Sequence, residues 1–77
     1  MIGYTDRIEI NPKLLSGKTV FKGTRIPISI VLKMLGDGAT FQKIIEEYPR
    51  LTEEDIKAAL DYSAFLVDHP EEEIINI

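Results

Sequence analysis

The spacing of apolar residues divides the chain into an extended N-terminal third and a helical remainder. Residues 7–10 alternate polar and apolar side chains, and residues 18–21 include β-branched threonine and valine, so both segments favour short strands. Thr24–Ile26 are expected to be extended, because Pro27 pushes the residue before it out of helical geometry. We therefore predict that residues 1–28 form an arm of strands and turns.

From residue 29 onward the apolar positions recur every three to four residues, which is the period of a helix. The pattern predicts three helices, over residues 29–35, 41–48 and 53–69. Their expected N-terminal capping residues are Ser29, Thr40 and Thr52. The last two helices are joined by a predicted three-residue turn, which fits a helix-turn-helix.

A chain of 77 residues has room for one domain. We divide it into the arm (1–28), a three-helix helix-turn-helix core (29–69) and a tail (70–77) that is first acidic and then apolar. The predicted fold class is mainly α, with a short N-terminal β arm. A domain of this size buries only about 60% of the surface that its unfolded chain exposes, so a second copy or a partner would add stability.

The third predicted helix carries two apolar strips. We expect the first strip to face the core; its residues are Ile56, Ala59, Leu60, Ser63 and Val67. The second strip is a predicted dimer or partner interface, because a surface helix needs only one apolar face. Its residues are Ala58, Tyr62, Phe65 and Leu66. The alternative is that the arm packs over this second strip.

The formal net charge of −4 conceals an asymmetry along the chain. Residues 1–31 carry five bases against two acids, whereas residues 32–77 carry four bases against eleven acids. Such blocks suit two different partners, or are simply two solvated faces. The asymmetry bears directly on nucleic-acid binding.

A helix-turn-helix places the start of its second helix in the DNA major groove. Here that start would be Glu53, Glu54 and Asp55, which DNA phosphates would repel. We therefore expect any DNA contact to lie in the arm. The candidate DNA-binding residues are Arg7, Lys13, Lys18, Lys22 and Arg25. For Arg25, an ion pair with a helix carboxylate that fixes the arm is an equally good interpretation.

The residues for catalysis or metal binding are sparse, so we predict a non-enzymatic protein without cofactor or metal. The chain has no cysteine and one histidine, His69, which we expect to be exposed at a helix end. Ser16–Thr19 resembles the end of a phosphate-binding P-loop, but that motif requires a glycine where this chain has Pro12. No signal peptide or membrane span is predicted, which favours a cytoplasmic location.

The stretch from Gly17 to Ile28, Gly-Lys-Thr-Val-Phe-Lys-Gly-Thr-Arg-Ile-Pro-Ile, is distinctive. Together with Ile44–Ile56 and Ala58–Tyr62 it resembles the family known as domain of unknown function 433, over residues 7 to 66. This family usually has proline where the present chain has Thr19. The resemblance implies a homeodomain-like, winged-helix-related three-helix unit that acts as a VapB-type antitoxin. It also implies dimerisation, DNA autoregulation and a PIN-like nuclease toxin as partner.

The tail is a candidate toxin-binding segment. Its acids would lie across the bases of the nuclease, and its isoleucines would add a strand to a sheet edge; the residues are Glu71, Glu72, Glu73, Ile74, Ile75 and Ile77. The alternative is an ordinary frayed terminus. The sequence thus predicts an antitoxin that neutralises a PIN-like nuclease and regulates its own promoter. The alternative function is a homodimeric protein-interaction module of helix-turn-helix shape without DNA binding.

Overall fold

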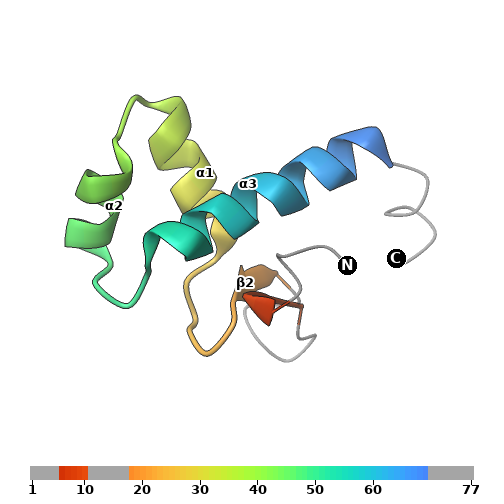
Figure 1. The fold of residues 1–77 in the computed structure, drawn as a ribbon, viewed down its shortest axis with the longest axis horizontal. Coiled ribbons are helices and arrows are strands. Elements are labelled where there is room, and N and C mark those ends of the chain that lie inside the picture. Colours follow the sequence, from red (N-terminus) through yellow and green to blue (C-terminus); the bar gives the residue numbers. More distant parts are fainter. Residues whose placement is uncertain (1–5, 11–17, 70–77) are drawn as a thin grey trace.

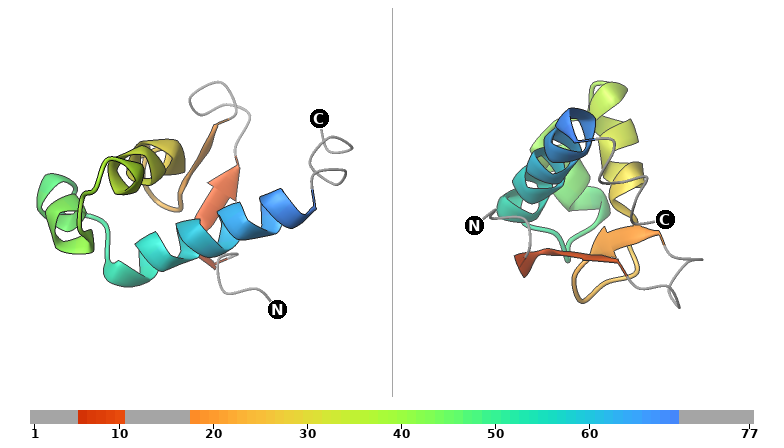
Figure 2. Two further views of the ribbon diagram at one scale, coloured as in Figure 1. Left: turned by 90° about the horizontal axis from the view of Figure 1, so that it is seen from above. Right: turned by 90° about the vertical axis from the view of Figure 1, so that its right-hand side faces the viewer.

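The N-terminal arm begins the fold as a two-stranded antiparallel sheet and is followed by three helices, as a computed structural model shows for residues 6–10 and 18–69 (Figure 1). The elements are β1 (Ile8–Ile10), β2 (Thr19–Phe21), α1 (Ile28–Gly36), α2 (Phe41–Glu47) and α3 (Glu53–Asp68). This arrangement confirms the predicted fold class of three helices with a short N-terminal β arm. Figure 2 shows both strands on one side of the molecule, beneath the helices.

The chain leaves β2, turns, and runs back beside the same strand before entering α1. In the sheet itself, Ile8 lies opposite Phe21. The backbone N–H of Phe21 donates to the carbonyl of Ile26 at 3.0 Å, and Val20 forms a bridge with Pro27. The expected extended course before Pro27 is therefore present, and it delivers the chain directly into α1.

Two of the three predicted N-caps are confirmed. The Thr40 hydroxyl accepts a hydrogen bond from the Lys43 N–H at 3.1 Å. Thr52 and Asp55 form a capping box, in which each side chain accepts from the other residue's backbone N–H. Ser29 does not cap α1, because the helix begins one residue earlier, after Pro27. The fixed φ of proline already sets the entry into this helix.

The segment between α2 and α3 is longer than predicted. Five residues, 48–52, separate the two helices, and within them Leu51 points inward with 1% of its surface exposed. The preceding connection, between α1 and α2, is shorter and contains Gly38 at φ 96°, a left-handed conformation that glycine adopts without strain. The order of helix, turn and helix predicted from the sequence is thus retained with a wider turn.

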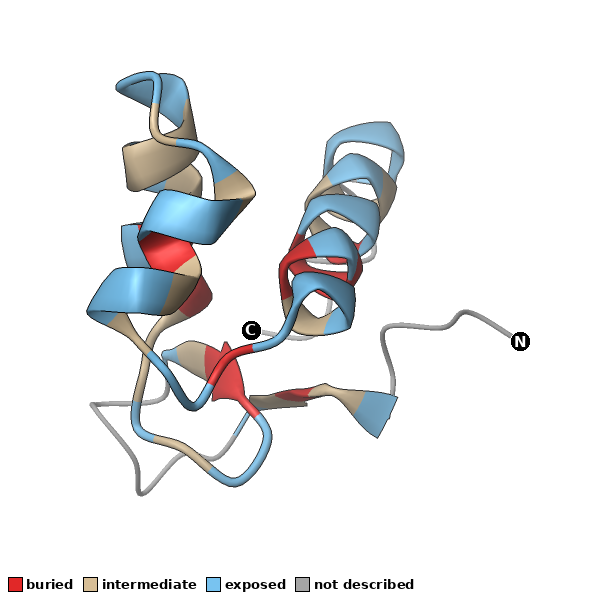
Figure 3. Ribbon diagram, turned by 60° about the vertical axis from the view of Figure 1, so that its left-hand side comes forward, coloured by how far each residue is buried: buried red, intermediate tan, exposed pale blue. Residues whose placement is uncertain are grey.

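A single apolar core joins the arm to the helices. Figure 3 shows the buried parts of the helices facing inward above the buried strand residues. No polar or charged side chain is buried in the described ranges 6–10 and 18–69. The buried residues are Ile8, Val20, Phe21, Ile28, Val31, Ile44, Leu51, Ile56, Ala58, Ala59 and Tyr62.

The predicted division of α3 into a strip that faces the core and an exposed strip that forms a dimer or partner interface is wrong in part. Ala58 and Tyr62, assigned to the exposed strip, are only 4% and 8% exposed and belong to the same cluster as Phe21. Conversely, Leu60 and Val67, assigned to the core strip, are 41% and 78% exposed. The reason is that the arm packs beneath α3 and buries the residues of the helix that face it. The buried side of α3 therefore differs from the side that three helices alone would bury.

Candidate nucleic-acid interface

The tight turn that follows β2, residues 22–26, presents basic side chains to solvent. Gly23 has φ 80°, which lets the chain reverse at this point. The N–H of Lys22 donates to the carbonyl of Arg7 at 2.8 Å, so the turn is also fastened to the segment that precedes β1. Lys22 and Arg25 are exposed on this fixed support.

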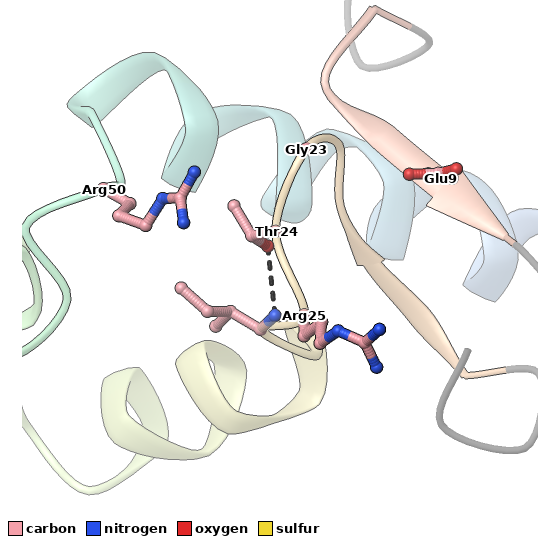
Figure 4. A pocket seen from close by; sticks show the side chains of 6 residues that line it. Glu9, Gly23, Thr24, Arg25 and Arg50 are labelled. Carbon is pink, nitrogen blue, oxygen red and sulfur yellow. Dashed lines mark hydrogen bonds between the residues drawn. The ribbon is translucent and has the colours of Figure 1, made fainter.

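Thr24 braces the turn from inside. Its hydroxyl donates to the Phe21 carbonyl at 2.7 Å and accepts from the Ile26 N–H at 3.0 Å, the second of these bonds being drawn in Figure 4. Its own N–H donates to the same Phe21 carbonyl at 3.0 Å. A single side chain therefore ties both arms of the turn together.

Replacing Thr24 with valine is expected to lower the free energy of unfolding by about 1–2 kcal/mol, because two hydrogen bonds disappear and the shape of the side chain is nearly kept. Urea denaturation followed by circular dichroism measures this loss. Thr19→Val is the matched control, since Thr19 is half-buried on β2 and lies outside the turn. Equal stability of the two variants would contradict the bracing role of Thr24.

Beside the turn lies an open hollow of about 520 Å³. Its lining residues are Glu9, Gly23, Thr24, Arg25, Ile26 and Arg50. Figure 4 shows the Arg50 side chain pointing toward Thr24, whereas Arg25 extends to the other side of the turn. Two exposed guanidinium groups thus flank one short stretch of backbone, and guanidinium is well suited to phosphate because it donates in a planar fork.

Arg50 is the basic residue that sequence reasoning missed. It lies in the segment between α2 and α3, twenty-five positions from Arg25, and the fold brings both to the same hollow. The available signal was a lone arginine after Pro49 in a predicted turn, which by itself indicates only an exposed charge.

Arg7, one of the predicted DNA-binding residues, is engaged elsewhere. Its guanidinium contacts the Asp55 carboxylate at 3.0 Å, and the two side chains are 42% and 16% exposed. The arm-fixing ion pair considered for Arg25 is thus made by Arg7, and Arg25 makes no ion pair within residues 6–10 and 18–69. Lys18 is exposed at a different hollow, and Lys13 lies outside the described residues.

The start of α3 remains acidic at its surface, as the sequence indicates. Glu53 and Glu54 are exposed, and Glu53 pairs with Lys57 at 3.7 Å. Asp55 is occupied by the capping box and by Arg7. These carboxylates stabilise the helix through its dipole, but they place negative charge where a reading helix would approach DNA.

A second hollow, of about 400 Å³, lies between α1, α3 and the start of β2. Its lining is mostly apolar and consists of Lys18, Thr19, Ile28, Ser29, Leu32, Tyr62, Ser63 and Leu66. Of the predicted interface strip, Phe65 and Leu66 are half-buried; the rings of Phe65 and His69 lie 4.3 Å apart between centroids. Their role in an interface stays a prediction; of the two residues, Leu66 lines this hollow.

The predicted toxin-binding residues of the tail, 71–77, lie outside the described residues. In the part of the chain that the structure describes, no three histidine, aspartate or glutamate side chains group so as to hold a metal ion. Nor does any helix there have the length and apolarity needed to cross a membrane.

The fold and its surface define a class: a small three-helix domain with a helix-turn-helix arrangement, an N-terminal β arm and a basic turn. The chain belongs to the family described as protein of unknown function (DUF433), whose model matches residues 8–63. It is similar to the crystal structure of a DUF433 member protein from Anabaena variabilis, with 30% sequence identity and a TM-score of 0.75. The similarity covers 90% of this chain and 68% of that one. A comparison with curated proteins finds no match.

Proposed function

We propose that this protein is the antitoxin-like component of a toxin–antitoxin pair in the cytoplasm, which binds and neutralises a PIN-like nuclease and contacts its own promoter. It acts by binding and not by catalysis, and it works as a homodimer. The observation that carries the proposal is the presence of two surfaces of different chemistry on one small domain. One is the basic turn with Arg50, and the other is the apolar hollow between α1 and α3.

The two surfaces suit two kinds of partner. Exposed arginines on a fixed turn suit phosphates, whereas an apolar hollow with few polar groups suits a protein segment. Within the described residues no charged side chain is buried, and Arg25 and Arg50 are exposed to solvent. The expected toxin-binding role of residues 71–77 is part of the same proposal.

Co-expression with a PIN-like nuclease encoded beside the gene tests the proposal. We expect the full chain to restore growth and to co-purify with the nuclease, and a variant ending at residue 69 to restore growth poorly, because the acidic and apolar tail is lost. Colony counts and pull-down yields measure both effects. Full protection by the shortened variant would refute the role of the tail, and failure of the full chain to bind would refute the antitoxin function.

A second candidate function is a homodimeric protein-interaction module that does not bind DNA. The acidic start of α3 favours it, since Glu53 and Glu54 occupy the surface with which helix-turn-helix proteins read DNA. A gel shift on the upstream promoter separates the two candidates, because only the first predicts a complex that weakens as salt rises.

A further inference from the structure

We propose that the phosphate backbone of duplex DNA lies across the hollow beside the turn and is held by Lys22, Arg25 and Arg50, so that a turn replaces the recognition helix. This inference rests on the promoter contact in the proposed function and names the residues and the chemistry that make it. Arg50 lies in the segment that connects α2 to α3, and it becomes a DNA contact alongside residues of the arm.

The arrangement of the arginines favours a polymer of phosphates over a single anion. Arg50 points toward Thr24, whereas Arg25 extends from the other side of the turn (Figure 4). Lys22 is exposed on the same turn. Guanidinium groups that do not converge on one point are poorly arranged to enclose one phosphate, but they can each meet a different phosphate along a strand.

The turn also offers backbone donors. The N–H groups of Gly23 and Arg25 make no hydrogen bond within the described part of the chain, whereas their neighbours Lys22, Thr24 and Ile26 all donate. A Cβ atom at Gly23 would meet no atom within 4 Å, so the space directly beside this residue is open. Backbone N–H groups are frequent donors to DNA phosphates, and they would add directed bonds to the charge of the arginines.

The acidic groups nearby restrict where the DNA can pass. Glu9 lines the same hollow from β1, so a phosphate would be repelled from that end and favoured over the Arg50 side. Arg7 is neutralised by Asp55, which removes it from the set of contacts. Glu53 and Glu54 at the start of α3 disfavour insertion of that helix into the major groove.

The salt dependence of binding tests this inference. The probes are two short duplexes, one from the upstream promoter and one of unrelated sequence, and fluorescence anisotropy gives the affinity between about 50 and 200 mM salt. Three phosphate contacts predict a fall in affinity of roughly 40-fold over this range, and Arg50→Ala should reduce the fall to roughly 12-fold. Arg50→Lys retains the charge and should keep the wild-type dependence.

Lys43→Ala is the matched control, since Lys43 is an exposed base on α2 outside the hollow. It should leave the salt dependence as in the wild type. If Arg50→Ala behaves like this control while the promoter is still bound, the inference is overturned and the promoter contact stands. If both duplexes bind equally well through Arg50, the inference stands and promoter regulation is refuted. If neither duplex binds, both are refuted.

Discussion

Replacing Phe21 with alanine is expected to lower the free energy of unfolding by about 3–5 kcal/mol, the usual cost of removing a buried phenyl ring. Phe21 is 1% exposed and joins the arm to the cluster that contains Ala58 and Tyr62. A domain of this length has a total stability of about 4–12 kcal/mol. The variant should therefore be largely unfolded well below the melting temperature of the wild type, as thermal denaturation by circular dichroism would show.

Phe65→Ala provides the control for this experiment. Phe65 is half-buried near the end of α3, so the same chemical change should cost only about 1 kcal/mol. If both variants lose similar stability, the arm does not belong to the cooperative core. If Phe21→Ala is much less stable, residues of the arm and of the helices unfold as one unit.

Replacing Asp55 with alanine is expected to cost about 2 kcal/mol, because this carboxylate has three structural roles. It accepts from the Thr52 N–H in the capping box, at 2.9 Å, and it pairs with Arg7 at 3.0 Å. It also lies at the positive end of the α3 dipole. Loss of this hydrogen bond of the capping box costs about 1 kcal/mol, and the ion pair and the dipole add about 0.5 kcal/mol each.

A double-mutant cycle separates these contributions. Arg7→Ala alone should cost less than about 1 kcal/mol, and the coupling between Arg7 and Asp55 should be about 0.5–1 kcal/mol, since Arg7 is partly exposed to solvent. Glu53→Ala, in the same helical turn, is the control and should cost only a few tenths of a kcal/mol. A coupling energy of zero from urea denaturation would show that the pair does not hold the arm to α3.

Local signals in the sequence predicted most of the secondary structure. The strands, the three helices and the caps at Thr40 and Thr52 all follow from residues within a few positions of one another. The exception at Ser29 is also local, because a proline before it had already set the start of α1.

The parts that the sequence did not predict depend on how distant segments meet. The period of α3 shows that it has apolar strips, but not that the arm would pack beneath it and bury Ala58 and Tyr62. Likewise, Arg7 and Asp55 are 48 residues apart, and nothing in their local surroundings indicates that they pair. Arg50 is a further example, because the fold places it beside Arg25 and no sequence motif links the two residues.

The hydrogen bonds of Thr24 determine which substitutions the exposed surface of the turn can accept. Each of its hydrogen bonds ends on a backbone atom, at Phe21 or at Ile26, so the shape of the turn does not depend on the side chains at 22 and 25. Both positions are exposed, and their substitution would alter charge without altering the loop. Natural variation or protein engineering at these two positions could therefore retune affinity and partner choice while the architecture stays constant.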